Sequence, residues 1–242
     1  MRKMMIAGAV FGMLWMGGTA FADYTEGRSF NYFNKTTYND RDWNVMFYEN
    51  CALPEYSSTQ WVEEGGERFL RFTLKNGQVG GCRSDNRARA RAPWWERAEV
   101  KQTNGLEPDR DYSLTFRIRF VNGFDNDREG FIQLHQSVEG CRTGALIIVR
   151  FSNGFLLGSM SLALIKDSRG RWLDARFDFN PSSHFSLYLD GKKMIENQGT
   201  RREAQAQCLL HLKIRIYRPG DELATGGRES VMDIDKLKLV DR

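Results

Sequence analysis

The sequence predicts an all-β fold, a β-jelly roll built as a sandwich of two antiparallel sheets. Three observations support this prediction. Short segments that alternate apolar and polar residues recur along the chain, turn signals such as Asn122-Gly123 and Asp190-Gly191 separate them, and stretches with helical periodicity are scarce. Many short strands joined by regular turns are typical of sandwiches and jelly rolls. No internal repeat or linker interrupts the pattern, so we expect one domain over residues 23–242.

Nine segments of the chain are predicted as strands because hydrophobic residues occupy every second position. One of them, residues 184–194, contains the Asp190-Gly191 turn signal and is expected to form a hairpin. Only residues 199–207 are expected to form a short helix. The predicted strand segments are residues 68–74, 96–102, 112–121, 130–136, 145–151, 171–179, 184–194, 211–217 and 231–240.

The N-terminus has the features of a secretory signal peptide. A basic pair at residues 2–3 precedes an apolar stretch at residues 4–16, and the Ala-Phe-Ala motif at residues 20–22 resembles a cleavage site. The apolar stretch is too short and too rich in glycine for a comfortable membrane span. We therefore expect residues 1–22 to be removed and the mature protein to be periplasmic or secreted, without membrane association. The formal charge then falls from +4 to +2, which by itself indicates no class of partner.

Four cysteines lie in the predicted mature chain. In an oxidising compartment they suggest two disulfide bonds, for which three connectivities are open. No Cys-x-x-Cys or His-x-x-x-His spacing indicates a metal site, and the sequence predicts no cofactor and gives no sign by which a structural calcium ion could be recognised. The cysteines are Cys51, Cys82, Cys141 and Cys208.

Several predicted strands alternate apolar residues with long polar or cationic ones. If the polar sides of these strands share one sheet, they form a groove suited to a long anionic ligand, because cations pair with carboxylate or sulfate. The alternative is that each strand has its own solvated face, as antiparallel sheets usually do. The polar residues are Arg97, Glu99 and Lys101, then Arg117, then Gln133 and His135, and finally Lys213, Arg215 and Tyr217.

Three of these segments, in this order, resemble the motifs of β-jelly-roll polysaccharide lyases, the group that contains alginate lyases, glucuronan lyases and heparin lyase I. The alginate-lyase motifs are R-[TS]-E-L-R, Q-[IV]-H and Y-F-K-x-G-x-Y. The corresponding segments here are RAEVK at residues 97–101, QLH at residues 133–135 and HLKIRIY at residues 211–217. The resemblance covers most of the chain after the signal peptide and implies a concanavalin-like jelly roll.

The heparin lyase I and glucuronan lyase branch is the closer one. It similarly has an R-A-E segment, a Q-x-H-Q segment, a W-x-D strand before a hairpin and a late K-x-G-x-Y-R strand, and the W-x-D counterpart here is residues 172–174. Three departures distinguish this chain from the lyase motifs. Lys101 replaces an arginine, His211 replaces an aromatic residue, and Arg215 replaces a glycine, so Arg215 is expected to alter the floor of the groove.

The resemblance implies an exported enzyme that cleaves a uronic-acid-containing anionic polysaccharide by β-elimination. Such an enzyme must offset the charge of the uronate carboxylate, remove the proton from C5 and protonate the leaving O4. Arg97 and Gln133 are predicted to offset the carboxylate, and His135 and Tyr217 to serve as base and acid. Nearby cations are expected to lower the pKa of Tyr217 by favouring its phenolate. The residues predicted to bind substrate are Lys213, Arg215, Lys101, Glu99 and Arg117.

Two histidines and one carboxylate are expected to play supporting parts. His184 and His211 lie in no chemical pattern of their own and are predicted to be structural. Glu99 is predicted to pair with Arg97 or Lys101 and to orient them.

Three other functions are weighed against the lyase. A glycoside hydrolase needs two carboxylates at a fixed separation, and the usual E-x-D-x-x-E strand is absent. A non-catalytic carbohydrate-binding protein would keep the groove and lose the acid and base, so it is the main alternative. A nucleic-acid binder could use Trp94 and Trp95 beside an arginine-rich loop, but export disfavours it. We therefore expect a monomer whose partner is an anionic polysaccharide, with no nucleic acid and no membrane.

The predicted use of His135 and Tyr217 in one site also predicts the disulfide pairing. Joint use suggests that residues 130–136 and 211–217 are antiparallel neighbours, which would bring Cys141 near Cys208. By exclusion, Cys51 would pair with Cys82.

Overall fold

A computed structural model describes the chain from residue 36 onward, apart from several internal segments. The predicted signal peptide and Cys141 lie outside the described residues. Side chains are not described for residues 151–161. The described ranges are residues 36–51, 58–75, 77, 79–82, 85, 94–124, 129–136, 144–152, 155–156, 160–161, 168–201, 204–206, 208–220 and 229–242.

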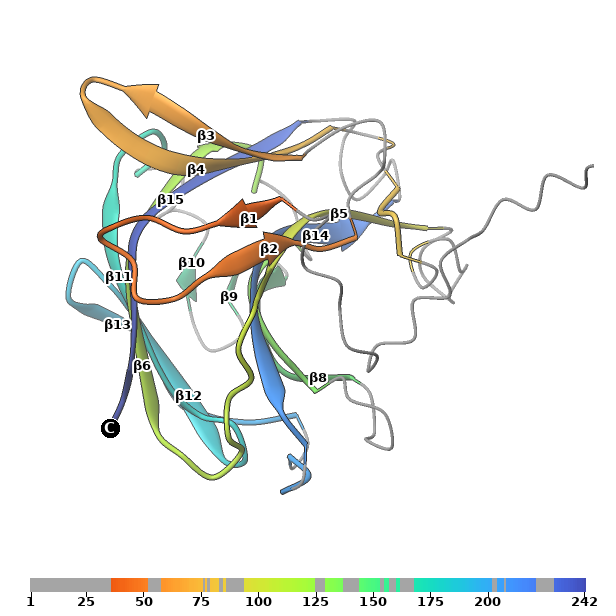
Figure 1. Ribbon diagram of the computed structural model, residues 1–242, viewed down its shortest axis with the longest axis vertical. Coiled ribbons are helices and arrows are strands. Elements are labelled where there is room, and N and C mark those ends of the chain that lie inside the picture. The colour runs from red at the N-terminus through yellow and green to blue at the C-terminus, as the bar shows by residue number, and fades with distance from the viewer. Residues whose placement is uncertain are drawn as a thin grey trace, which may run out of the picture.

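Two antiparallel sheets form the fold, as the sequence predicted (Figure 1). In spatial order, the eight-stranded sheet contains β1 (Thr37–Tyr38), β2 (Phe47–Glu49), β5 (Trp95–Gln102), β14 (Leu210–Pro219), β7 (Gly130–Gln136), β8 (Gly144–Ser152), β9 (Phe155–Leu156) and β10 (Met160–Ser161). The seven-stranded sheet contains β13 (Lys192–Gly199), β12 (His184–Leu189), β11 (Leu173–Asn180), β6 (Tyr112–Asn122), β15 (Ser230–Asp241), β4 (Glu67–Leu74) and β3 (Thr59–Glu64).

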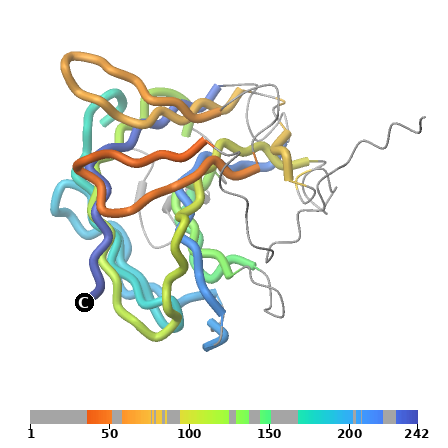
Figure 2. Tube along the Cα trace, viewed as in Figure 1, coloured from red at the N-terminus to blue at the C-terminus, as the bar shows by residue number. Residues whose placement is uncertain are grey.

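Both sheets take strands from distant parts of the sequence. In the eight-stranded sheet β14 lies between β5 and β7, and in the seven-stranded sheet β15 lies between β6 and β4 (Figure 2). The last two strands of the chain therefore join segments that are far apart in sequence. Interleaving of this kind is typical of jelly rolls, because each sheet draws strands from both halves of the chain.

The hydrophobic core lies between the two sheets. Alternation along each strand sends apolar side chains inward, so that Ile214 and Ile216 of β14 and Ile118 of β6 are fully buried in one cluster. The polar residues of the same strands point away from this core. Each sheet therefore has an outer face that carries charged side chains, and the two outer faces are chemically different.

Several expectations need correction. Residues 201 and 204–206 are not helical, and the sequence missed β1, β2 and β3, which are short or carry mixed polar residues. Alternation along residues 130–136 places Phe131 on the same side as Gln133 and His135, but in the structure Phe131 does not share the outer face with Gln133. A register irregularity between β7 and β14 sets two residues of β14 against Phe131, which turns inward and packs edge-on against Phe120. In the described residues no helix is long and apolar enough to cross a membrane.

The predicted hairpin is confirmed. β12 and β13 are joined by Asp190 and Gly191, and both residues have positive φ angles of 47° and 72°. A two-residue turn with two positive φ angles matches the twist of the flanking strands, which explains why the Asp-Gly pair predicted it.

One disulfide joins Cys51 to Cys82, as predicted. It closes a stretch with a sequence separation of 31 and holds the residue after β2 beside the segment that precedes β5. Cys208 is also disulfide-bonded, and its predicted partner, Cys141, lies outside the described residues.

Candidate functional site

Three neighbouring strands of the eight-stranded sheet carry the predicted site residues, with the exception of Arg117. β14 lies between β5 and β7, and its register aligns their polar positions. Lys213 of β14 lies between Lys101 of β5 and Gln133 of β7, while Arg215 lies opposite Glu99. The sequence expectation that these polar sides share one outer face is therefore confirmed.

The same register separates the predicted base from the predicted acid. Tyr217 lies opposite Arg97 on one side and Gly130 on the other, whereas His135 lies opposite His211. His135 lies five positions along β7 from Gly130, a rise of about 16 Å. The backbones of Tyr217 and His135 therefore lie toward opposite ends of one sheet face.

Glu99 is the centre of the charged residues on this face. Its two carboxylate oxygens lie 3.2 Å from Arg97 and from Lys213 and 3.1 Å from Arg215. The side-chain amide of Asn50 donates a further hydrogen bond to it. Burial alone would raise the pKa of Glu99, but the surrounding cations hold it well below the usual value. We call Glu99, Arg97, Lys213, Arg215 and Asp85 the Glu99 cluster.

Asp85 extends this cluster at the end where the disulfide lies. Its carboxylate is 2.5 Å from a terminal nitrogen of Arg97, and the other terminal nitrogen of Arg97 donates to the sulfur of Cys51. Burial raises the pKa of Asp85, although Arg97 opposes that change. Arg97 is thus fixed by two carboxylates and a sulfur, which confirms the expected pairing with Glu99 and gives Arg97 a strong structural role.

The cluster carries more cations than carboxylates. Among the described residues, three cations face the two carboxylates within it, and Lys101 lies beside it. The charged side chains are not in an open groove as expected, because Lys101, Lys213 and Arg215 are each at most 2% exposed. Screening by water is weak in such a region, so these charged groups interact strongly with one another.

Three partly exposed rings lie at the rim of the buried charges: His135, His211 and Tyr217. The Tyr217 ring is stacked on Trp95 at 4.9 Å, and the guanidinium groups of Arg97 and Arg215 lie over it at 4.9 and 4.1 Å. The expected lowering of its pKa is wrong. Burial raises the pKa of Tyr217 more than the two arginines lower it, so the phenol keeps its proton at neutral pH.

His211 is a functional candidate that the sequence did not single out. It is the direct cross-strand neighbour of His135, a position that brings side chains within about 4.5–5.5 Å at Cβ. The Nδ1 atom of each ring has no hydrogen-bond partner among the described residues. Burial and nearby lysines lower the pKa of His135 well below its usual value and that of His211 to about 3. Two neutral imidazoles therefore lie side by side.

The sequence contains a signal for this pair, but the signal can be recognised only when the pairing register of the two strands is known. His211 lies two residues before Lys213, and His135 lies two residues after Gln133. Once Lys213 is paired with Gln133 in an antiparallel arrangement, His211 must lie opposite His135. Gln133 lies beside them, and its Oε1 atom also has no partner in the described part of the chain.

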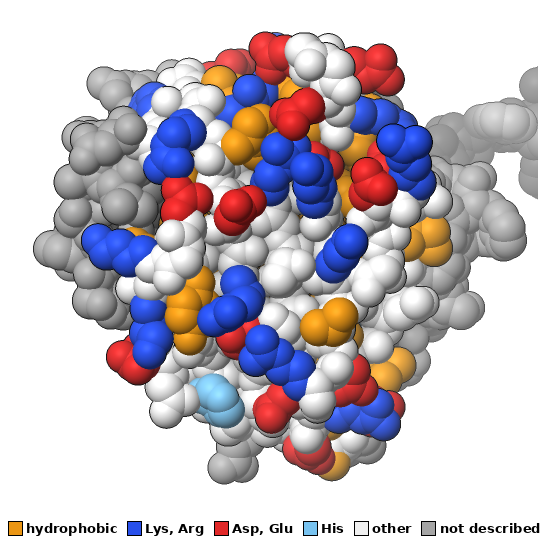
Figure 3. All heavy atoms as spheres, turned by 90° about the vertical axis from the view of Figure 1, so that its left-hand side faces the viewer, with side chains coloured by type: hydrophobic (Ala, Val, Ile, Leu, Met, Phe, Trp, Pro, Cys, Tyr) orange, Lys and Arg blue, Asp and Glu red, His pale blue; other side chains and the backbone are white. Residues whose placement is uncertain are grey.

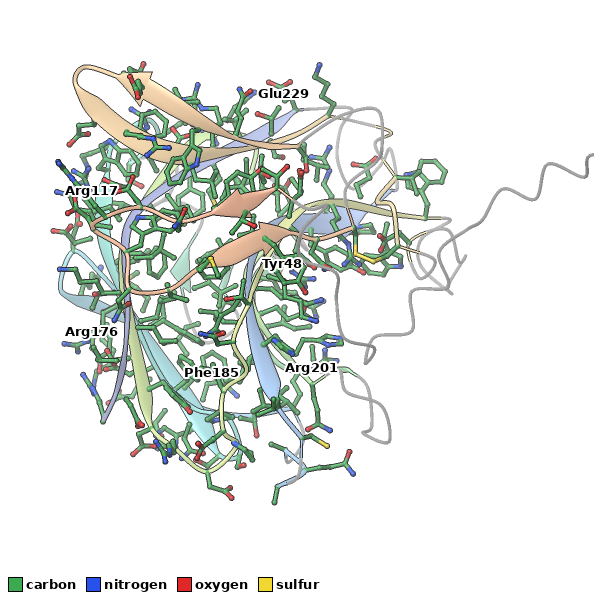
Figure 4. The ribbon with its side chains drawn as sticks, in the orientation of Figure 1. Tyr48, Arg117, Arg176, Phe185, Arg201 and Glu229 are labelled. Atoms are coloured by element: carbon green, nitrogen blue, oxygen red, sulfur yellow. A yellow bond between two sulfur atoms is a disulfide. The ribbon has the colours of Figure 1, made fainter. Side chains whose placement is uncertain are left out.

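Arg117 does not belong to this site, and its predicted role in substrate binding there is wrong. It lies on β6 in the seven-stranded sheet and projects from that sheet's outer side (Figure 4). Its guanidinium is 2.6 Å from Asp235 and 3.0 Å from Glu67. Alternation along a strand indicated a polar side for Arg117 but carried no information about which sheet would hold the strand.

A metal site is not supported by the groups that lie close enough to form one. The sulfurs of Cys51 and Cys82 and a carboxylate oxygen of Asp85 lie within 4.8 Å of one another. Both sulfurs are used in the disulfide, and Asp85 accepts from Arg97. This group is therefore a structural support of the Glu99 cluster.

Comparisons with known proteins give limited likeness. No protein-family model matches the chain, and no curated protein matches it. Among solved structures, a variant of the family 7 alginate lyase A1-II′ in complex with substrate is 10% identical, covers 77% of this chain and 83% of its own, and has a TM-score of 0.49. An alginate lyase from Pseudomonas aeruginosa is 13% identical, with 78% and 88% covered and a TM-score of 0.46. The cellulose-induced protein Cip1 is 10% identical, with 88% and 93% covered and a TM-score of 0.44.

Proposed function

We propose that this protein is a polysaccharide lyase that cleaves a uronic-acid-containing anionic polysaccharide by β-elimination. The observation that carries the proposal is the pair of neutral histidines, His135 and His211, beside Gln133 and Lys213 on one sheet face. Proton-transfer groups and donors for a carboxylate thus lie on directly adjacent strand positions. Export, as expected from residues 1–22, would bring the protein to extracellular polymers of this kind.

The negative charge of the uronate carboxylate opposes removal of the C5 proton, so this charge must first be offset. Gln133 and Lys213 are cross-strand partners, and each lies two residues along its strand from a histidine of the pair, on the same face. An amide donor and an ammonium group directed at a carboxylate become more favourable as negative charge develops during proton removal.

The elimination itself requires one proton acceptor and one donor. The acceptor takes the C5 proton, a double bond forms between C4 and C5, and the C4–O4 bond breaks with its electrons on O4, which takes a proton. A neutral imidazole has one nitrogen that accepts and one that donates, so His135 and His211 can share these two steps. The bound carboxylate would raise the pKa of His135 from its lowered value, because an opposite charge favours the imidazolium.

Tyr217 has a different part in this proposal from the one first expected. It lies with Arg97 and Trp95 toward the other end of the sheet face from His135, where an extended polymer would place a neighbouring sugar. We assign this end of the face to binding of a neighbouring part of the polymer. The Tyr217 phenol remains protonated and can donate a hydrogen bond there.

The experiment is to incubate the protein with glucuronan, alginate and heparin and to follow unsaturated uronates by ultraviolet absorbance. On whichever polymer is cleaved, His135→Ala should lower kcat at least 100-fold, in line with the loss of a proton-transfer group. Tyr217→Phe should lower it less than 10-fold. The matched control is His184→Ala, since His184 is exposed at the start of β12 in the other sheet.

Two results would contradict the proposal. One is binding of the polymers without any unsaturated product, which would indicate a carbohydrate-binding protein. The other is retention of turnover by His135→Ala together with a collapse in Tyr217→Phe, which would return the chemistry to the Tyr217 end of the face.

A further inference from the structure

A cavity of about 560 Å³ lies on the outer side of the seven-stranded sheet, on the opposite side of the molecule from the Glu99 cluster. Its floor is formed by β6 and β11, where Thr115, Arg117 and Arg176 point outward. Gly191 of the β12–β13 hairpin lines one side and Asp42 lines another. The volume is within the roughly 300–1,000 Å³ that is usual for sites that bind small molecules.

Cations outnumber carboxylates in the lining of this cavity. Two of the four cations are already engaged, since Arg117 pairs with Asp235 and Arg176 lies 3.2 Å from Asp178. The other two, Lys236 and Lys238, are exposed and form no ion pair among the described residues. The cavity therefore has two ammonium groups that are available to a ligand (Figure 3 shows the mixture of basic and acidic side chains on this side).

A β-bulge places both lysines at the cavity. β15 pairs with β6 through Asp235 opposite Arg117 and then through Lys238 opposite Thr115, which leaves two residues of β15 against one of β6. The extra residue allows Leu237 to stay fully buried in the core while Lys236 turns outward. Lys236 adopts a left-handed conformation with a φ of 54°, which is costly for a residue other than glycine. Lys236 and Lys238 are two residues apart and would share a face even in a regular strand, but Asp235 would then lie on the other face. The bulge puts both lysines on the same outer face as Asp235 and Arg117.

The remaining lining groups indicate a sugar rather than a dense polyanion. The carboxylate of Asp174 is exposed in the cavity, as is the hydroxyl of Thr115, and both can accept hydrogen bonds from sugar hydroxyls. The Tyr188 ring adds an aromatic surface, with the guanidinium of Arg176 at 4.0 Å from its centre. A nucleic acid would bring closely spaced phosphates against Asp174 and Asp42, which repel them. A chain with about one charge per sugar would satisfy the lysines and the acceptors together.

We propose that this cavity is a second saccharide-binding site, specific for an acidic oligosaccharide whose carboxylate or sulfate groups pair with Lys236 and Lys238. The proposal goes beyond the lyase activity and does not depend on it. A second site on the opposite sheet would hold the protein on a polymer that is longer than one site, because two linked contacts raise the effective concentration of each.

The test uses the full chain with His135→Ala and Gln133→Ala, so that the probe is neither cleaved nor well bound on the other face. The probe is a hexamer of 1,4-linked glucuronate, and cellohexaose is its neutral counterpart. In this background, Lys236→Gln with Lys238→Gln should weaken binding of the acidic hexamer at least 10-fold by calorimetry. Cellohexaose should bind much more weakly than the acidic hexamer.

The control removes the same charge elsewhere, by Lys75→Gln with Arg110→Gln, and should change affinity less than 2-fold. Hydrogen exchange should show that the acidic hexamer protects residues 173–176 and 235–238. Equal weakening in the control and the lysine variants would overturn the proposal, as would equal binding of cellohexaose. Protection confined to β5, β7 and β14 would also overturn it. None of these outcomes changes the activity test, so failure of this site and failure of the lyase proposal can be distinguished.

Discussion

The two outer faces of the sandwich contain the same kinds of residues in opposite circumstances. On the eight-stranded sheet, Arg97, Lys213 and Arg215 surround Glu99, and their side chains are 3–7% exposed. On the seven-stranded sheet, Arg71 and Arg119 both bind Asp233, and their side chains are 26% and 15% exposed. Arginines that look equivalent in sequence are therefore sealed from water on one face and partly hydrated on the other.

Charge balance separates the two faces as clearly as burial does. Each arginine of the seven-stranded sheet pairs with a carboxylate, either alone or together with a neighbouring arginine. Glu64 approaches both Arg71 and Arg119, and Glu67 approaches Arg117. In the Glu99 cluster three cations share Glu99, and Asp85 is a second carboxylate for Arg97. A partly hydrated network keeps the help of water when one member is lost, whereas a buried network leaves the partners of a lost member without hydration.

Of the substitutions that compare the two faces, Glu99→Gln should lower the free energy of unfolding most. The substitution keeps the shape and a hydrogen-bond acceptor for Asn50 but removes the carboxylate charge that pairs with Lys213 and Arg215 in the interior. Removing one member of a buried charge group typically costs about 3–5 kcal/mol. Urea unfolding should show this loss in the free energy of unfolding. A loss below about 1 kcal/mol would mean that the cluster is as well compensated as the other face.

Asp233→Asn should have a smaller effect. Asp233 is itself buried, but Arg71 and Arg119 retain contact with water and with Glu64 after the change. Loss of hydrogen bonds to charged groups costs about 1.5–3 kcal/mol, and hydration of the arginines should place the value toward the lower end. The same unfolding measurement applies. If Asp233→Asn destabilised the protein more than Glu99→Gln, exposure of the cations would not explain the difference between the faces.

His211→Gln should make the free energy of unfolding less dependent on pH, which tests the burial of this part of the eight-stranded sheet. Burial and Lys101 lower the pKa of His211 to about 3 in the folded protein, while the unfolded chain titrates near 6.5. The unfolded state therefore binds an extra proton between these values, and stability falls as pH decreases from about 6.5 toward 3. The slope is at most about 1.4 kcal/mol per pH unit from this group.

The measurement is urea unfolding at pH 7 and pH 5 for the wild type and the variant. The wild type should lose more stability than His211→Gln on going to pH 5, because glutamine does not titrate. Equal losses in the two proteins would show that His211 binds its proton as readily in the folded protein as in the unfolded chain, so that burial does not keep this imidazole neutral at pH 5.

Much of the architecture could be predicted from local alternation. Ile214 and Ile216 face the core, and Lys213 and Arg215 face outward, because successive side chains of a strand point to opposite sides. The Asp190-Gly191 hairpin followed from its turn residues. The antiparallel pairing of β7 with β14 was expected from the joint use of His135 and Tyr217 in one site, and the Cys51–Cys82 bond followed by exclusion. These features depend on neighbours in sequence or on few alternatives.

What the sequence determined by itself was which side of each strand is polar. Which sheet a strand joins, and in what register, was decided only by the tertiary structure. Arg117 shows the first point and the pairing of His135 with His211 shows the second. The physical reason is that alternation has a period of two along one strand, so it is satisfied in either sheet. Only packing of the complete core selects the partner strands, the bulges and therefore the side chains that meet.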